Sequence, residues 1–206
     1  MSRTRIKFCG LTRIDDVRAA AELGVDAVGF VLTKKSPRFV DPAHARTLRD
    51  ALPPFVSAVA LFMDDDAAWV EHVISTLRPD WLQFHGAEPA PFAESFDRPY
   101  LKAVPMASVV DVDAFAASHP HASGFLLDSH TLGAAGGSGE AFDWTRAPRN
   151  FARPLVLAGG LDAGNVAQAI AIAKPYAVDV SSGIESAPGI KDATKMRAFV
   201  DAVRDA

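Results

Sequence analysis

Residues 5–12 read Arg5-Ile6-Lys7-Phe8-Cys9-Gly10-Leu11-Thr12, and this stretch, with seven comparable runs, decides the fold. It is a short run typical of a strand, it stops at a glycine, and a helical pattern begins a few residues later. The other runs are rich in Val, Ile, Leu and Phe, as strands buried on both faces of a parallel sheet are. The predicted strands are 6–9, 27–31, 57–62, 81–85, 100–104, 124–128, 155–158 and 177–181.

Amphipathic stretches between these strands predict helices. Several of them start at residues that suit helix N-termini, among them Thr12, Asp41 and Asp66. Gly24 stands where a glycine commonly ends a helix. The predicted helices are 15–23, 42–51, 66–77, 91–96, 111–118, 164–174 and 193–203.

Eight strands in 206 residues give units of roughly 26 residues, the spacing of successive strand-helix modules. An open doubly wound sheet would need only five or six strands. We therefore predict an α/β protein with a single (β/α)8 TIM barrel over residues 1–206, with parallel strands and short helices. The one long connection, 129–143, is rich in glycine and predicts a mobile loop over the site.

Composition argues against several classes of partner. The net charge of −4 and the isoelectric point near 5.8 do not fit a nucleic-acid-binding domain, which needs a basic face. The longest uncharged apolar stretch, 52–63, contains two prolines and is too short to span a bilayer, and the first five residues do not resemble a signal peptide. The one cysteine excludes an internal disulfide. We expect a soluble cytoplasmic protein, a monomer or weak homodimer, with no nucleic-acid or membrane partner.

Strand alternation predicts which side chains meet inside the barrel. Cys9 alone could be an ordinary buried apolar residue. However, Cys9, His85, Asp128 and Ser181 share the same parity on four strands and are expected to converge at the carboxyl-terminal mouth, where barrel enzymes keep their chemistry.

A buried charge pair is expected below this mouth. Lys7 and Asp179 lie on the first and eighth strands, which are neighbours in a closed barrel, and both should face inward. A buried lysine without a partner is costly, so we expect the two within salt-bridge reach.

Two glycine-bearing turns follow the seventh and eighth strands. Gly159 and Gly160 form the first, and Ser182 and Gly183 belong to the second. Barrel enzymes often bind phosphate at these two turns through backbone N–H groups, although ordinary strand-helix turns can look similar.

Metal and cofactor chemistry finds little support in the sequence. The six histidines and one cysteine show no ligand spacing, and a direct pair between Cys9 and His85 is not expected, because the two strands are far apart around the barrel. We expect no metal and no cofactor. What remains is acid–base chemistry on a small phosphorylated molecule.

Motifs along nearly the whole chain resemble, in order, those of the phosphoribosylanthranilate isomerase family. Each motif alone is short, but their combination is highly specific. The resemblance implies an enzyme of tryptophan biosynthesis. The matching stretches are 7–12, 36–38, 82–86, 126–129, 136–139, 142–144, 158–161, 165–166, 178–185 and 189–192.

The resemblance also implies a reaction and roles for residues. N-(5'-phosphoribosyl)anthranilate would become 1-(2-carboxyphenylamino)-1-deoxyribulose 5-phosphate by an Amadori rearrangement. Cys9 maps to the general base and Asp128 to the general acid, Arg38 to the site of the anthranilate carboxylate, and His85 to a substrate contact. An acid needs a pKa raised by burial, and the leucines before Asp128 suggest an apolar setting.

Small departures from the family pattern, at Phe84, Ser138 and near Asn165, touch neither the proposed acid nor the proposed base. The alternatives are another phosphate-binding barrel enzyme, of the indole-glycerol-phosphate synthase or two-aspartate aldose–ketose isomerase type, and a non-catalytic phosphate-binding barrel. The synthase would want a longer N-terminal extension, and the two-aspartate isomerase would want Asp at position 9.

Overall fold

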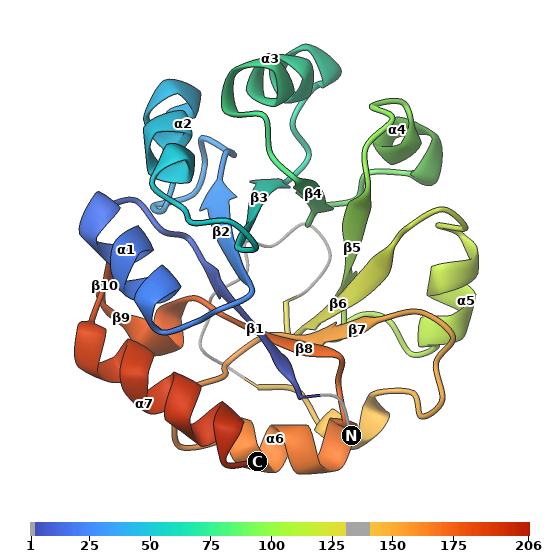
Figure 1. Ribbon diagram of the computed structural model, residues 1–206. Coiled ribbons are helices and arrows are strands. Elements are labelled where there is room, and N and C mark those ends of the chain that lie inside the picture. The colour runs from blue at the N-terminus through green and yellow to red at the C-terminus, as the bar shows by residue number, and fades with distance from the viewer. Residues whose placement is uncertain (1–2, 131–140) are drawn as a thin grey trace.

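The computed structural model describes residues 3–130 and 141–206. Eight parallel strands close into a barrel, in chain order, and β1 pairs with β8. Figure 1 looks along the barrel, with the helices in a ring around the strands. The predicted TIM-barrel fold is confirmed. The barrel strands are β1 (Arg5–Cys9), β2 (Ala27–Val31), β3 (Ser57–Phe62), β4 (Trp81–Phe84), β5 (Tyr100–Pro105), β6 (Gly124–Asp128), β7 (Leu155–Leu157) and β8 (Ala177–Val180).

The α-helices are short, from five to twelve residues, as expected. Between β6 and β7 there is a 3-10 turn, η1 (Trp144–Arg146), in place of a full helix. No helix in the two described ranges is both long and apolar enough to cross a bilayer. The α-helices are α1 (Ile14–Glu22), α2 (Pro42–Asp50), α3 (Ala67–Leu77), α4 (Ala90–Glu94), α5 (Val112–Ala117), α6 (Val166–Ala173) and α7 (Ala193–Arg204).

Most of the expected helix ends are correct. Asp41 accepts a hydrogen bond from the backbone N–H of Ala43, and Asp66 accepts one from Trp69. Gly24 follows α1 with a φ of 73°. The prediction that Thr12 caps α1 is wrong: its hydroxyl instead donates to the Gly189 carbonyl, at 2.6 Å.

This contact reaches a small hairpin that the strand pattern did not predict. After β8, a 3-10 turn, η2 (Ser182–Ile184), leads into β9 (Glu185–Ala187) and β10 (Ile190–Lys191), which pair antiparallel. The hairpin lies beside α1 and α7 (Figure 1). Its turn therefore ties the end of the barrel sheet to the loop after β1.

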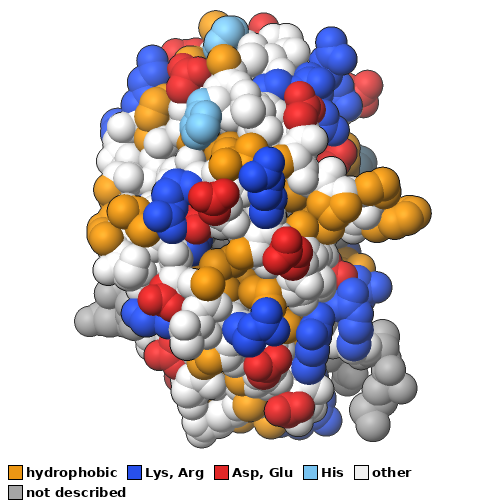
Figure 2. Space-filling view, turned by 60° about the vertical axis from the view of Figure 1, so that its left-hand side comes forward, with side chains coloured by type: hydrophobic (Ala, Val, Ile, Leu, Met, Phe, Trp, Pro, Cys, Tyr) orange, Lys and Arg blue, Asp and Glu red, His pale blue; other side chains and the backbone are white. Residues whose placement is uncertain are grey.

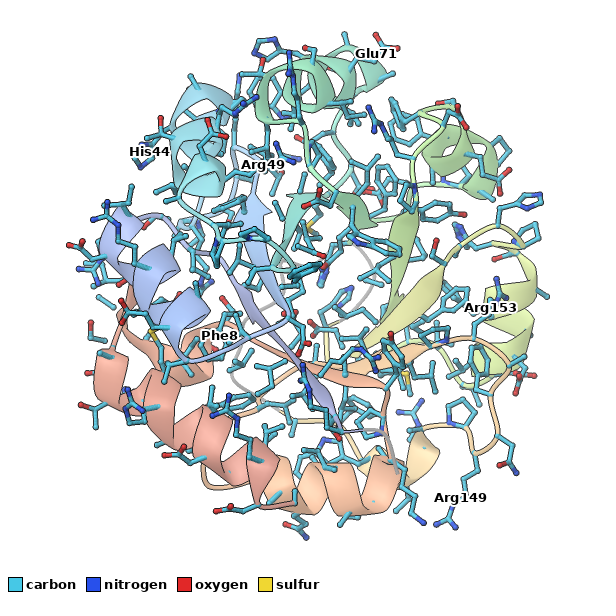
Figure 3. The ribbon with its side chains drawn as sticks, in the orientation of Figure 1. Phe8, His44, Arg49, Glu71, Arg149 and Arg153 are labelled. Carbon is cyan, nitrogen blue, oxygen red and sulfur yellow. The ribbon has the colours of Figure 1, made fainter. Side chains whose placement is uncertain are left out.

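The alternation expected along β1 is confirmed. Ile6 and Phe8 belong to the core between strands and helices, where the Phe8 ring meets Phe199 of α7 at 6.1 Å. Figure 3 shows Phe8 on the helix side of β1. Cys9 instead packs inside the barrel with Val31 and Leu61.

The outer surface mixes charges. Figure 2 shows lysine and arginine side chains interspersed with acidic and apolar ones over one face. In the predicted loop 129–143, Gly133, Gly136, Gly137 and Gly139 lie outside the described residues.

Candidate active site

A cavity of about 100 Å³ opens at the carboxyl-terminal mouth of the barrel. Cys9 ends β1 and Asp128 ends β6, and both line it together with His85, Ser181 and Arg38. The four strand-end side chains predicted to converge therefore do so, and Arg38 joins them from the loop after β2.

The predicted interior charge pair lies directly below. Lys7 Nζ is 2.9 Å from Asp179 Oδ1, and both side chains are less than 10% exposed. Burial lowers the pKa of Lys7, but the Asp179 charge and a contribution from Cys9 outweigh it and leave the pKa raised. The lysine stays charged next to the thiol.

Gly29 of β2 makes room for this arrangement. A Cβ at position 29 would lie 2.9 Å from Cys9 Sγ and 3.1 Å from Lys7 Nζ. Any other residue would displace both side chains. A glycine inside a predicted strand is a recognised sign of close approach, so the sequence carried this signal.

Burial raises the pKa of the Cys9 thiol. The positive charge of Lys7 opposes this effect, while Asp179 reinforces it, and the net pKa lies above its ordinary value. At neutral pH the resting protein therefore holds Cys9 mainly as the thiol.

The pKa of Asp128 shifts in the opposite direction, to a lower value. Burial raises its pKa, but the nearby His130 side chain, the charges of His85 and His130, and the hydrogen bond from the His130 backbone N–H together lower it below the ordinary value. The expectation of an apolar setting is wrong, because Leu127 faces the helices and two imidazoles flank the carboxylate. The resting protein holds Asp128 as the carboxylate.

His130 is a residue that the sequence interpretation missed. Its backbone N–H donates to Asp128 Oδ1 at 3.1 Å, and its ring stacks on His85 at 4.4 Å. The signal was a histidine two residues beyond a strand-end aspartate. Burial lowers the pKa of His85 to about 4, so this imidazole is neutral at pH 7.

Arg38 is held in an ion pair. Its Nε and Nη2 donate to Glu185 at 2.9 and 2.8 Å, and Lys191 Nζ donates to the same carboxylate at 2.7 Å. Burial raises the pKa of Glu185, but the two cations lower it overall. Neither Glu185 nor Lys191 was predicted to belong to the site, although both lie in stretches that match the family motifs.

Gly10 allows Arg38 to reach this position. Its φ is 72°, in the left-handed region, and a Cβ there would lie 2.7 Å from Arg38 Cδ. The loop after β1 thus supports the arginine as well as the cysteine.

The two predicted phosphate turns pack on neighbouring backbone. Gly159 and Gly160 have φ values of 78° and 64°, and a Cβ at 159 would lie 2.6 Å from the Ser129 nitrogen. A Cβ at Gly183 would collide with the Leu161 carbonyl, so the turns after β7 and β8 touch. Neither these glycines nor Ser182 lines the 100 Å³ cavity, whose lining reaches Ser181, one residue before the second turn.

Within the described residues, one group could hold a metal ion. His85, Asp128 and His130 each offer a ligand atom, and these atoms lie within 4.8 Å of one another. No ligand spacing in the sequence predicts this set, because its members come from two strand ends and a loop.

Residues 6–202 match the family model described as N-(5'phosphoribosyl)anthranilate (PRA) isomerase. A protein of that name from Xanthomonas oryzae pv. oryzae is 56% identical over 210 residues, covering 99% of this chain and 95% of the relative. The relative from Nitrosospira multiformis is 49% identical, covering 97% of this chain and 96% of its own.

Solved structures agree with the sequence matches. Phosphoribosyl anthranilate isomerase from Thermus thermophilus superposes with a TM-score of 0.88 at 36% identity, covering 98% of this chain and 99% of its own. Another isomerase, solved with reduced 1-(o-carboxyphenylamino)-1-deoxyribulose 5-phosphate, gives a TM-score of 0.82 at 34% identity, covering 98% and 100%. With its barrel, its mouth and these similarities, the chain belongs to the N-(5'-phosphoribosyl)anthranilate isomerase family.

Proposed function

We propose that the barrel mouth catalyses the Amadori rearrangement of N-(5'-phosphoribosyl)anthranilate, with Cys9 as general base and Asp128 as general acid. The reaction itself follows from the family: the chain is an isomerase of tryptophan biosynthesis. The observation that carries the assignment of roles is that Cys9 and Asp128, from β1 and β6, line the same cavity.

The chemistry matches these two groups. Asp128 donates a proton to the ribose ring oxygen as the bond between that oxygen and C1 breaks, which leaves an iminium ion at C1. The iminium makes the hydrogen on C2 acidic, and the Cys9 thiolate removes it. The resulting enolamine tautomerises to the ketone, so no atom is gained or lost.

The protonation states set the pH dependence. The reaction needs a thiolate and a carboxylic acid, whereas the pKa directions favour a thiol and a carboxylate in the resting protein. The two forms differ only in where one proton sits, so their ratio does not change with pH between the two pKa values. Catalysis therefore uses a minor form, and kcat/KM should be flat across neutral pH, falling only below the Asp128 pKa and above that of Cys9.

Arg38 suits the anthranilate carboxylate. A guanidinium has five N–H donors, and Glu185 takes two of them, which leaves donors for a second carboxylate while fixing the plane of the fork. Arg38→Lys should raise KM for the substrate, because an ammonium cannot keep both contacts. A lysine variant with wild-type KM would mean that Arg38 serves only the Glu185 pair.

The turns at Gly159–Gly160 and Ser182–Gly183 suit the substrate phosphate, because glycines let the backbone N–H groups of strand-helix turns approach an anion closely. The first turn has positive φ angles at both glycines, and the second packs against the first at Gly183. Gly183 is a poor place for a test, because any side chain there collides with the backbone. Ser182→Asp places a negative charge at the proposed site and should raise KM by about tenfold or more through like-charge repulsion, with kcat little changed. An unchanged KM would argue against this position.

His85 is proposed to contact the substrate from its position directly after β4, beside Asp128. Further proposals concern the whole molecule: residues 1–206 act as one barrel domain, as a monomer or weak homodimer, in the cytoplasm. One similar solved structure is of monomers generated from the dimeric isomerase of Thermotoga maritima, so light scattering over a range of concentrations is the appropriate measurement. Cell fractionation tests the location.

The decisive experiment follows the loss of substrate fluorescence. Asp128→Asn should lower kcat by about 10²- to 10⁴-fold, as removal of a general acid does, with an unchanged circular-dichroism spectrum. Asp50→Asn, on the exposed end of α2, is the matched control and should keep full activity. Wild-type protein that leaves this substrate unchanged would instead favour one of the other phosphate-binding barrels.

A further inference from the structure

Three buried side chains meet at the edge of the mouth. His85 follows β4, Asp128 ends β6, and His130 lies two residues further. His85 Nε2 is 3.5 Å from Asp128 Oδ2, and His130 Nδ1 is 3.4 Å from Asp128 Oδ1. All three residues are less than 10% exposed.

The ring nitrogens of this cluster lack hydrogen-bond partners. His85 Nε2 and both ring nitrogens of His130 are buried, yet none has a partner with hydrogen-bond geometry among the described residues. Their distances to Asp128 exceed the 2.7–2.9 Å of a charge-assisted hydrogen bond. Buried polar atoms left in this way cost free energy, so the cluster suits a group that would engage them.

Gln83 prepares His85 to act as a ligand. Its amide nitrogen Nε2 lies 3.2 Å from His85 Nδ1, and its Oε1 has no partner in the described part of the chain. Rotating the amide by 180° exchanges its nitrogen and oxygen, so that Oε1, which is otherwise unpartnered, accepts the Nδ1–H and the Nε2 lone pair is directed at Asp128. Metal-binding histidines are commonly oriented by a partner of this kind on the other nitrogen.

The ligand set selects the class of ion. The set offers two imidazole nitrogens and one carboxylate oxygen, and Zn²⁺, Co²⁺ or Ni²⁺ prefer nitrogen donors of this kind. Ca²⁺ and Mg²⁺ prefer sites made entirely of oxygen ligands. Ligand atoms within 4.8 Å need to close to roughly 3.3 Å from one another for tetrahedral bonds of about 2.0 Å, a movement within the reach of side-chain rotation.

We propose that His85, Asp128 and His130 form a binding site for a divalent transition-metal ion, with Zn²⁺ the preferred occupant, and that the ion and the substrate exclude one another. The second statement rests on the proposed function, since a metal-bound Asp128 cannot donate a proton. The site is an inhibitory one, with a water molecule completing the coordination.

Direct binding to the full chain tests the site without reference to activity. Equilibrium dialysis with Zn²⁺ should give one ion per chain, and Co²⁺ should show the visible absorption of tetrahedral coordination. His130→Gln should weaken binding by at least about 10- to 100-fold, and His85→Asn by a similar factor. His121→Gln, on an exposed turn, is the matched control and should bind as wild type does. Thermal melts monitor the fold of each variant.

Cys9 lines the same cavity, so its thiol must be tested as a ligand. Cys9→Ser should bind Co²⁺ as tightly as wild type, and no thiolate-to-cobalt charge-transfer band should appear. A charge-transfer band that disappears in Cys9→Ser would overturn the assignment to the histidine cluster. So would wild-type affinity in His130→Gln and His85→Asn, or an absence of binding to the wild type.

Competition between Co²⁺ and the reaction product tests the metal site and the mutual exclusion separately. The reaction product should displace Co²⁺ from the wild type, and continued binding of both would overturn the exclusion. If Co²⁺ binds at the cluster while Asp128→Asn retains full activity, the metal site stands and the assignment of the acid fails.

Discussion

The two ends of the barrel offer cavities of different size and different chemistry. The mouth encloses about 100 Å³ and is lined by Cys9, His85 and Asp128, whose pKa values are all shifted. The amino-terminal end encloses about 330 Å³, and Phe55 and Tyr176 on its rim are exposed. The smaller cavity is the one with reactive groups.

The charged side chains at the amino-terminal end are already engaged with partners. Arg5 lies over the Tyr176 ring at 4.1 Å, Asp26 pairs with Arg3, and Lys7 reaches up to Asp179. The mouth instead holds buried nitrogens without partners beside a thiol and a carboxylate. Reactivity in this protein follows from unsatisfied, buried polar groups at the carboxyl ends of the strands, and cavity volume alone does not locate it.

The largest effect should come from the mouth. Cys9→Ser should lower kcat by about 10²- to 10⁴-fold, because a hydroxyl is a far weaker base than a thiolate, while the fold and substrate binding persist. Stopped-flow fluorescence of the substrate gives kcat, and circular dichroism gives the fold. Turnover within about tenfold of wild type would show that Cys9 is not the base.

The Lys7–Asp179 ion pair lies inside the barrel between its two ends, and breaking it should strongly lower the free energy of unfolding. Asp179→Ala leaves a buried lysine unpaired and should lower the free energy of unfolding by about 3 kcal/mol or more. Urea unfolding measures this change. Asp50→Ala, which breaks the exposed pair with Arg46 on α2, is the control and should cost less than about 1 kcal/mol.

A double replacement tests the physical reason. Lys7→Met with Asp179→Leu removes both charges and should recover most of the stability lost in Asp179→Ala. If the double variant is as unstable as the single one, packing and not the unpaired charge explains the loss.

Two buried histidines should make the protein less stable at acid pH. Burial lowers the pKa of both His85, at the mouth, and His119, beside α5, to about 4. Between pH 6.5 and 4 the unfolded chain binds these protons and the folded chain does not, so stability is complete above pH 6.5 and is lost as the pH falls. At pH 5, each histidine should lower the free energy of unfolding by roughly 1–2 kcal/mol relative to its value above pH 6.5.

Removing one of the two isolates the contribution of the mouth. His119→Gln should halve the difference in unfolding free energy between pH 7 and pH 5, as measured by urea titration, and the remainder belongs mainly to His85. An unchanged difference in this variant would mean that His119 does not titrate as its burial indicates.

The smallest effect belongs to the amino-terminal end. Phe55 is fully exposed and has a φ of 73°, in the left-handed region where a bulky residue is strained. Phe55→Gly relieves this strain and should raise the free energy of unfolding by about 0.5 kcal/mol, after the entropic cost of glycine. kcat/KM should stay at the wild-type value, and a loss of activity would connect this end of the barrel to the chemistry.

The sequence by itself determined the barrel and most of the convergence at its mouth. Successive side chains of a strand point to opposite faces, so if Cys9 at the end of β1 points into the barrel, Phe8 must point outward to the helices. Closure of eight strands makes the first and last strands neighbours, which predicts the Lys7–Asp179 pair, and the structure has this pair. These are consequences of local geometry repeated along the chain.

Only the tertiary structure decided how the site is held and charged. Glu185 meets Arg38 from 147 residues away, through a hairpin too short and polar to show a strand pattern. His130 reaches Asp128 from a loop, where no periodicity fixes side-chain direction. The lowered pKa of Asp128 depends on these neighbours and on burial, and both arise only when the barrel closes.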